Sequence, residues 1–249
     1  MKSLIAITTM LATTMICAAL LAADAPESIR APAGTAESRQ AQTQPDKKAA
    51  GDPYTLSTCI VSGEKLGSMG EPVVKKIDGR EVRFCCGGCI RTFEKSKDEY
   101  LKKIDEQIIK DQEPLYPLKT CVVETDDLLF DADGKFTGVN YVHNNRLIRF
   151  CCGECIEGFK ADPDKFIAKL NEAVAKQQGE DYPLMTCPVS GEALGSMGKP
   201  IEKVVANRLV RFCCSGCTKE LEKNPAAVIA KIDEARKAKT SNAGGKANQ

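Results

Sequence analysis

The sequence predicts an α+β protein made of three tandem copies of one small module. Each copy contains a cysteine loop, a β-hairpin, a cysteine-rich helix start and a broken amphipathic helix. One observation is a four-cysteine pattern that occurs three times and uses 12 of the 13 cysteines. The other is an octapeptide, Val-Arg-Phe-Cys-Cys-Gly-Gly-Cys at 82–89, which recurs with small changes at 148–155 and 210–217. Such self-similarity at a fixed period is typical of a repeat array.

In each copy a lone cysteine precedes a Cys-Cys-x-x-Cys cluster. The gap between the two is 25 residues in the first and third copies and 29 in the second. The three sets are Cys59 with Cys85, Cys86 and Cys89; Cys121 with Cys151, Cys152 and Cys155; and Cys187 with Cys213, Cys214 and Cys217.

Residues 1–23 have the features of a secretory signal peptide. Lys2 is followed by an apolar run from Leu4 to Leu21 and then by small residues. The alternative is a membrane anchor, but a run of this length is at the lower limit for spanning and contains several threonines. Cys17 is expected to leave with the signal. We therefore expect a periplasmic or secreted protein, whose thiols meet an oxidising or metal-exposed compartment.

Composition sets the other boundaries. Residues 24–53 are rich in Ala, Pro, Gln, Ser and Lys, so they are predicted to be a disordered linker, and residues 238–249 a disordered tail. Between them lie modules at 54–110, 116–176 and 182–237. Modules of this size, without Trp and with 5% aromatic residues, have thin cores and often need metal or disulfides. The net charge of +1 gives no reason to expect a nucleic-acid partner.

The loop and the hairpin come first within a module. Residues 58–72 are Gly-rich and irregular, and they match residues 186–200 at 12 of 15 positions. A hairpin follows at 73–84, because Asp78-Gly79 is a strong two-residue turn signal. Asn144-Asn145 and Ala206-Asn207 occupy the same place in the other copies.

A broken helix follows each cluster. Apolar residues recur at helical spacing: Ile90, Phe93, Leu101, Ile104 and Ile108 in the first copy, and Ile156, Phe159, Ile167, Leu170 and Val174 in the second. Asp162-Pro163 and Asn224-Pro225 each place an N-cap residue before a proline, which predicts a second helix starting there.

The cluster therefore lies between the second strand and a helix start. Residues at i, i+3 and i+4 share a helical face, so at least two sulfurs per module should converge. The helix N-terminus favours thiolate, the form that binds metal or attacks disulfides. With the loop cysteine, this describes a treble-clef-like metal site with three sulfurs. A second loop ligand, expected near Val61 to Gly63, is absent, so the fourth position is left to the vicinal cysteine, a water or an outside ligand.

The segment Phe84-Cys-x-x-x-Cys89-x-x-x-Phe93, preceded by a lone cysteine, resembles the YHS/TRASH family of small metal-binding domains. The resemblance implies heavy-metal binding, sensing or trafficking on a treble-clef-like fold. It implies as ligands Cys59, Cys85 and Cys89; Cys121, Cys151 and Cys155; and Cys187, Cys213 and Cys217. The chain departs from the family pattern in its longer gap, in the additional Cys86, Cys152 and Cys214, and in the acidic loop of the second module, which carries Glu124, Asp126, Asp127, Asp131 and Asp133.

Other interpretations of these residues remain open. The four cysteines of a module could form two structural disulfides, or a redox-active thiol pair. Met69 and Met197 are either soft Cu(I) ligands or loop-core residues. His143, the one histidine, is expected to be a surface strand residue. The Asp131-x-Asp133-Gly134 segment is expected to be a turn, because Val142 stands where a calcium loop needs Glu.

The sequence thus predicts an exported, non-enzymatic protein that binds a heavy metal for sequestration, trafficking or sensing. The nearly all-sulfur ligand set favours Zn(II) or Cu(I). A metal-transport or metal-delivery protein is the expected partner, and no membrane span is expected after signal removal. The alternatives are a thiol–disulfide redox protein of the cell envelope and an interaction scaffold with structural zinc or disulfides.

Overall fold

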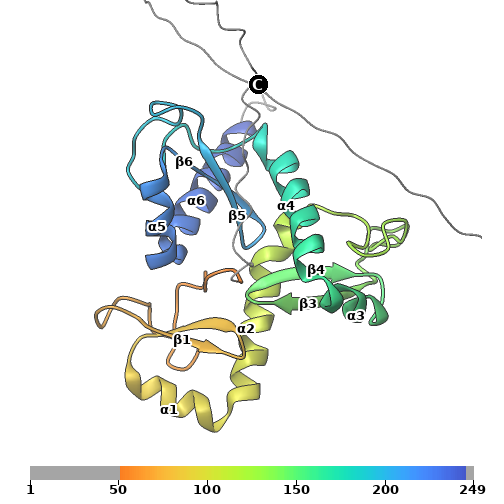
Figure 1. Ribbon diagram of the computed structural model, residues 1–249, viewed down its shortest axis with the longest axis horizontal. Coiled ribbons are helices and arrows are strands. Elements are labelled where there is room, and N and C mark those ends of the chain that lie inside the picture. Colours follow the sequence, from red (N-terminus) through yellow and green to blue (C-terminus); the bar gives the residue numbers. More distant parts are fainter. Residues whose placement is uncertain (1–50, 245–249) are drawn as a thin grey trace, which may run out of the picture. The chain divides into compact units, whose positions relative to one another are not determined.

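The computed structural model describes residues 51–244 (Figure 1). The predicted signal peptide, residues 24–50 of the predicted linker and residues 245–249 of the predicted tail lie outside the described residues. Within them, helices alternate with three two-stranded antiparallel sheets, as the α+β prediction requires.

The same order of elements occurs three times. The first module contains β1 (Val73–Ile77), β2 (Arg80–Phe84), α1 (Gly87–Lys95), α2 (Lys97–Gln112) and the short 3-10 helix η1 (Glu113–Leu115). The second contains β3 (Val139–His143), β4 (Arg146–Phe150), α3 (Glu154–Ala161) and α4 (Pro163–Gly179). The third contains β5 (Ile201–Val205), β6 (Arg208–Phe212), α5 (Ser215–Lys223) and α6 (Pro225–Gly244).

The three predicted hairpins are confirmed. In the first, Ile77 pairs with Arg80, so only Asp78 and Gly79 form the turn. Both turn residues have positive φ, 52° and 84°, as the two-residue turn requires. The second and third turns also place both residues at positive φ.

The predicted helix breaks are confirmed as well. Asp162 Oδ1 accepts a hydrogen bond from the Lys165 N–H (3.3 Å), and Asn224 Oδ1 accepts one from the Ala227 N–H (3.3 Å). Each cap starts a second helix, because it satisfies a backbone donor that the first turn of a helix leaves free.

A thin core fills each module. Phe84 meets Phe93 edge-on at 5.2 Å between ring centroids, and Phe150 meets Phe159 at 5.6 Å. In the third module Phe212 shares its cluster with Leu221. The cysteines of each cluster complete these cores, so the sulfur atoms are themselves part of the buried packing.

In the first and second modules, a glutamine near the end of the module's second helix hydrogen-bonds to the hairpin of the next module. Gln112 Nε2 donates to the Asn145 carbonyl (2.8 Å), and its Oε1 accepts from the Leu147 N–H (2.9 Å). Gln178 makes the same pair of bonds to Asn207 and Leu209, both at 2.9 Å. We call these two arrangements the helix-end clamps. Gln112, which falls between the predicted modules at 54–110 and 116–176, is the buried last residue of α2.

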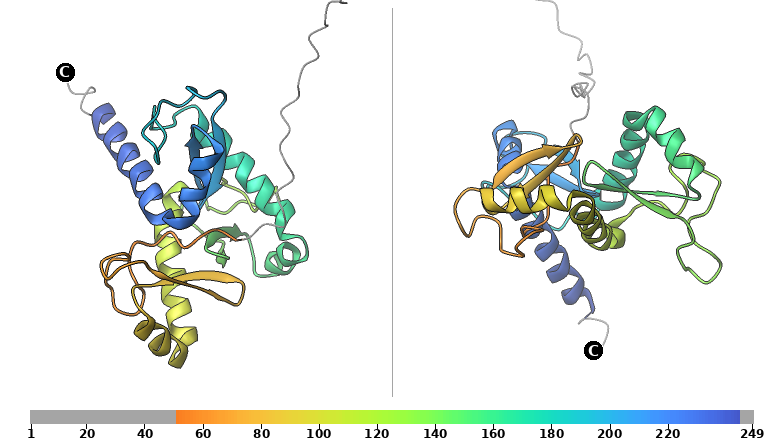
Figure 2. Two further views of the ribbon diagram at one scale, coloured as in Figure 1. Left: turned by 60° about the vertical axis from the view of Figure 1, so that its left-hand side comes forward. Right: turned by 90° about the horizontal axis from the view of Figure 1, so that it is seen from below.

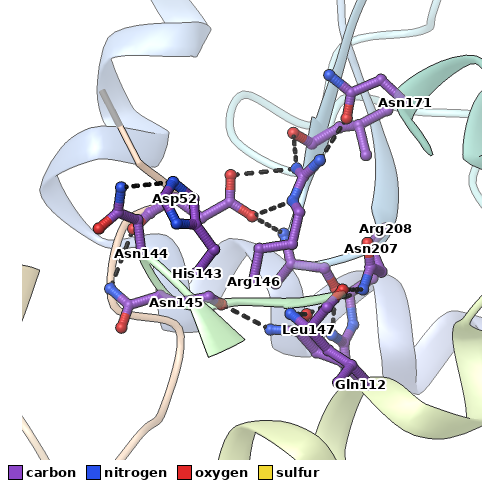
Figure 3. Close-up of polar contacts among 12 residues, drawn as sticks. Asp52, Gln112, His143, Asn144, Asn145, Arg146, Leu147, Asn171, Asn207 and Arg208 are labelled. Atoms are coloured by element: carbon purple, nitrogen blue, oxygen red, sulfur yellow. Dashed lines mark hydrogen bonds and ion pairs between the residues drawn. The ribbon is translucent and has the colours of Figure 1, made fainter. Parts of the chain in front are cut away.

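The turn asparagines extend the clamps to the preceding hairpin (Figure 3). Asn145 Nδ2 donates to the carbonyls of Glu81 (2.9 Å) and Asp52 (3.0 Å). Asn207 Nδ2 donates to the Leu147 carbonyl (2.9 Å) and to Gln112 Oε1 (3.1 Å). Both asparagines are fully buried, so each of these bonds satisfies a group that has lost its water.

At the first end of the repeat, the clamp pattern is completed by Asp52. Gly79 takes the place of the turn asparagine in the first hairpin. The Asp52 carbonyl accepts a hydrogen bond from Asn145 Nδ2. One module later, Gln112 Oε1 accepts the equivalent bond from Asn207 Nδ2. The Asp52 carboxylate also binds Arg146 Nε (2.7 Å) and the Ala206 N–H (2.6 Å). Residue 52, predicted to lie in the disordered linker, is therefore fixed by the second and third modules.

At the other end, Arg236 completes the pattern. Thr240 stands in α6 where the earlier helices carry the clamp glutamine. Arg236 donates to Gln178 Oε1 (2.9 Å), as a turn asparagine would. Residues 238–244, predicted to be disordered, belong to α6. Within them, Lys239 forms an ion pair with Asp181 (3.2 Å).

The first and third modules also contact each other. Arg83 donates to the carbonyls of Glu222 and Lys223 at the end of α5, where unpaired carbonyls favour a cation. Arg208 pairs with Asp111 of α2 and with Asp233 of its own α6. All described modules thus belong to one compact unit (Figure 2).

We expect Gln178→Ala to lower the free energy of unfolding by about 1–3 kcal/mol for each buried backbone group left unpaired. The change removes the partners of the buried Asn207 carbonyl and Leu209 N–H. Denaturant titration measures the loss. The control is Gln177→Ala, the exposed neighbour in the same helix. Equal stability of the two variants would contradict the structural role of the clamp.

Candidate metal centre

Three groups of three sulfur atoms lie together, with all atoms of a group within 4.8 Å of one another. We call them the sulfur triads. Their members are Cys59, Cys85 and Cys89; Cys121, Cys151 and Cys155; and Cys187, Cys213 and Cys217. The structure therefore brings together the nine cysteines that the family resemblance implied as ligands.

The lone cysteine of each triad is held by a tight turn. In the first module the Cys59 N–H donates to the Glu64 carbonyl (2.8 Å), and the Gly63 N–H donates back to the Cys59 carbonyl (2.8 Å). Gly63 has a φ of 75°, which favours glycine there. Cys187 makes the equivalent bonds with Glu192 and Gly191 in the third module.

The other two sulfurs come from the end of a strand and the start of a helix. Cys85 directly follows β2, and Cys89 lies in the first turn of α1. Helical spacing was expected to bring Cys85 and Cys89 together, and that explanation is wrong. Cys85 and Cys86 precede the helix, and Cys86 is its extended N-cap residue with a φ of −159°. The backbone bend between strand and helix is what brings the sulfurs together.

The extra cysteines lie beside the triads. The Sγ–Sγ distance from Cys86 to Cys89 is 3.8 Å. The Cys152–Cys155 and Cys214–Cys217 distances are both 3.7 Å. Cys86 and Cys214 are partly exposed and Cys152 is exposed, whereas Cys89 and its counterparts are buried. Of the 12 predicted ligands, nine therefore form the triads and three flank them at the surface.

The loop cysteine has a lowered pKa in all three triads. Burial raises its pKa, but hydrogen bonds from backbone N–H groups and a nearby serine outweigh this effect. The pKa of Cys59 falls to about 7 through the N–H groups of Cys85 and Ser62 and the Ser62 side chain. The pKa of Cys187 falls to about 6 in the same way, and that of Cys121 is also lowered.

The helix cysteine has the opposite tendency. Burial, followed by hydrogen bonds to neighbouring thiols, raises the pKa of Cys89 to about 12. Burial likewise raises the pKa of Cys217 to about 12 and that of Cys155 to about 11. The first and third sites thus pair a sulfur whose pKa lies near neutral with one whose pKa is raised well above it, so that a cation must displace the proton of the second sulfur.

A serine beside two of the triads was missed from the sequence. Ser62 Oγ lies 3.3 Å from Cys85 Sγ, and Ser190 Oγ lies 3.3 Å from Cys213 Sγ. These serines lie in the stretch where a second loop ligand was expected and none was found. The signal was available, because Ser-Gly-Glu is part of the loop that the first and third modules share.

The second module is built differently at this point. Glu124 stands where the others carry serine, and its N–H donates to Cys121 Sγ (3.4 Å). Burial and a hydrogen bond with Asp127 raise the pKa of Cys151. The altered acidic loop therefore gives the second site different neighbours from the other two.

The remaining candidate residues do not join the triads. Met69 and Met197 have exposed fractions of 67% and 69%, so they do not fill the loop core. His143 is half-buried against Phe159, with 5.1 Å between ring centroids. Asp131 Oδ1 accepts from the Asp133 and Lys135 N–H groups, so the segment is a turn, as predicted.

Comparisons with known proteins add no match: no family model, no curated protein and no solved structure matches the chain. Across residues 51–244, none of the helices has the length and apolar character that crossing a membrane requires. The resemblance to the YHS/TRASH family stays a prediction.

Metal affinity should rise with pH. The raised pKa of Cys89 means that this thiol is protonated at pH 7, so a metal must displace its proton. Below about pH 7, Cys59 holds a proton as well, and affinity should fall more steeply. Each displaced proton changes the apparent affinity about tenfold per pH unit. Zinc competition titrations measure this over a range from about one pH unit below to about two pH units above the Cys59 pKa. A flat profile would contradict thiol ligation.

Proposed function

We propose that the protein binds thiophilic heavy-metal ions, one at each sulfur triad, and carries or sequesters them outside the cytoplasm. The proposal places it among non-enzymatic metal-binding proteins. The observation that carries it is the convergence of three sulfurs from a loop, a strand end and a helix start in all three modules.

The electrostatics of the triads support metal binding. The backbone N–H groups that lower the pKa of the loop cysteine hold an anionic sulfur in place. Two further sulfurs lie against it in buried surroundings. A bound cation compensates the negative charge of neighbouring thiolates. It also replaces the protons that the buried thiols otherwise keep.

The ligand set supports a soft or borderline ion. Three thiolates suit Zn(II) and Cu(I) better than Mg(II) or Ca(II), which prefer oxygen. Zn(II) would take a fourth ligand to complete a tetrahedron, whereas Cu(I) is satisfied by sulfur alone. An open fourth position suits transfer, because a ligand from a metal-transport or metal-delivery protein can enter there.

The finer assignments belong to the same proposal. Each module is treble-clef-like and related to the YHS/TRASH domains, which the lone cysteine and the Cys-x-x-x-Cys spacing support. Export is supported by the basic start and the apolar run of residues 1–23. The balanced charge gives no reason to expect a nucleic-acid partner.

The mature protein should bind about three equivalents of zinc or copper, since three triads are present. The second site should have a different affinity because of Glu124 and Asp127. Metal analysis of protein purified anaerobically measures the stoichiometry. Native protein with all thiols oxidised, no metal, and no uptake after reduction would end the proposal.

Single substitutions should rank the cysteines of the first module. Cys85→Ser and Cys89→Ser each remove a triad member and should abolish that site, leaving about two equivalents bound. Cys86→Ser, the matched control next in sequence, should keep all three. X-ray absorption gives the number of sulfur neighbours. Loss of metal in Cys86→Ser with retention in Cys85→Ser would reverse the assignment.

Chelation should lower the melting temperature strongly. The triad sulfurs belong to thin cores, so metal binding contributes to the free energy of folding of each module. Differential scanning fluorimetry before and after chelator treatment tests this under reducing conditions. An apo form that melts with the holo form would show that the metal does not support the fold.

A further inference from the structure

Each module carries a second sulfur pair beside its triad, and this pair shares one atom with the triad. Cys89 belongs to the first triad and also faces Cys86 Sγ at 3.8 Å. The pairs Cys152–Cys155 and Cys214–Cys217 repeat the arrangement, both at 3.7 Å. A disulfide needs the sulfurs at about 2 Å, which side-chain rotation at an N-cap residue can supply.

Access distinguishes this pair from the other close sulfurs. Cys85 Sγ is also near Cys89 Sγ, at 3.5 Å, but Cys85 is only 4% exposed and Cys59 is fully buried. An incoming reagent must first reach a sulfur at the surface. In the first and third modules, Cys86 and Cys214 lie beside the triad and are partly exposed to solvent. In the second module, Cys152 is the most exposed cysteine.

In the first module, the residues between the paired cysteines keep this access free. Gly87 and Gly88 follow Cys86, and neither carries a side chain that could cover its sulfur. Cys86 is the extended N-cap residue of α1, so its sulfur lies at the helix start beside Cys89 Sγ. The exposed sulfur is thus positioned toward solvent on one side and toward Cys89 on the other.

We propose that the exposed cysteine of each module reacts with a low-molecular-weight disulfide and then forms a disulfide with the helix cysteine, discharging the metal of that triad. The inference rests on the proposed function, because Cys89, Cys155 and Cys217 are treated as metal ligands. It adds a chemical activity, thiol–disulfide exchange, to the binding site.

The first step forms a mixed disulfide. The Cys86 sulfur, as thiolate, attacks one sulfur of the disulfide R–S–S–R. The S–S bond of the reagent breaks, one R–S⁻ leaves, and Cys86 becomes bonded to the other R–S group.

The second step closes the pair. The Cys89 sulfur attacks the Cys86 sulfur, the mixed disulfide breaks, and the second R–S⁻ leaves. The two protein sulfurs lose two electrons and the reagent gains them as two thiols. In the metal-free protein the protons of Cys86 and Cys89 end on the two released thiols. In the loaded protein Cys89 gives up the metal ion instead of a proton, and the second R–S⁻ takes its proton from water.

Two sulfurs of the triad then remain, Cys59 and Cys85. Zn(II) held by two protein thiolates lacks half of a tetrahedral set, so it should dissociate to any competing ligand. Reduction of the Cys86–Cys89 bond restores the triad. The exchange is therefore a reversible release step that depends on the disulfide level of the compartment.

The test uses the zinc-loaded full chain and oxidised glutathione. Zinc release is followed with a chromogenic chelator, and disulfides are mapped by mass spectrometry of proteolytic peptides. Release should coincide with formation of the Cys86–Cys89, Cys152–Cys155 and Cys214–Cys217 bonds. Cys152→Ser gives an internal control: the first and third modules should discharge as in the unaltered chain, while the second holds its zinc about tenfold longer or more, because its accessible attacking thiol is gone.

Two results would overturn the inference. One is equal release from all three modules of Cys152→Ser. The other is a map in which the loop cysteines, rather than the exposed ones, carry the new bonds. Failure of the proposed function has a different signature: the reduced chain binds no zinc, yet oxidised glutathione still joins Cys86 to Cys89. Cys152→Ala repeats the comparison, and its initial zinc content checks that the variant is folded.

Discussion

The structure depends on the hydrogen bonds that the hairpin turns make, because the turns are where the modules meet. Asn145 and Asn207 have positive φ, and their amides are fully buried. Each clamp glutamine hydrogen-bonds to two backbone groups of the next hairpin: it donates to a carbonyl and accepts from an N–H. Without these partners, burying the turns would cost the desolvation of every polar group there. The orientation of each hairpin, and with it the strand end that supplies a triad cysteine, follows from these bonds.

The triads lie in the same cores that hold the modules together. Cys59, Cys85 and Cys89 pack with Phe84 and Phe93, so the sulfurs contribute both apolar contact and ligand atoms. Small modules have little other material with which to build a core. Loading the site and ordering the module are therefore expected to be one equilibrium. Cys86 and Cys214 lie at the edge of these cores, partly exposed, and Cys152 is exposed, so a reagent can reach them without opening the core.

Much of the module could be predicted from the sequence because its signals are local. Asp78-Gly79 fixes a two-residue turn, and Asp162-Pro163 fixes a helix start. The triads also followed from the repeated spacing, although their geometry did not, since Cys85 and Cys86 precede the helix. What the sequence did not reveal is long-range. Asp52 and Gln112 look like linker residues until partners 94 and 35 positions away are seen. The closeness of Ser62 Oγ to Cys85 Sγ depends on the folded loop, because the two residues lie 23 positions apart.

The ends of the repeat have a consequence for how such a protein can change in copy number. At an internal junction, the Oε1 of the clamp glutamine accepts a hydrogen bond from the next turn asparagine. At the two ends of the repeat, Asp52 and Arg236 already make the equivalent bonds. A duplicated module joined at either end would meet a satisfied surface, with Gly79 or Thr240 where it needs an amide. Gain of a fourth binding unit would thus require substitutions at the junction as well as the duplication. Insertion between existing modules would supply a matched glutamine and asparagine at each junction, but it would separate the first and third modules and lose the bonds from Arg83 to Glu222 and Lys223.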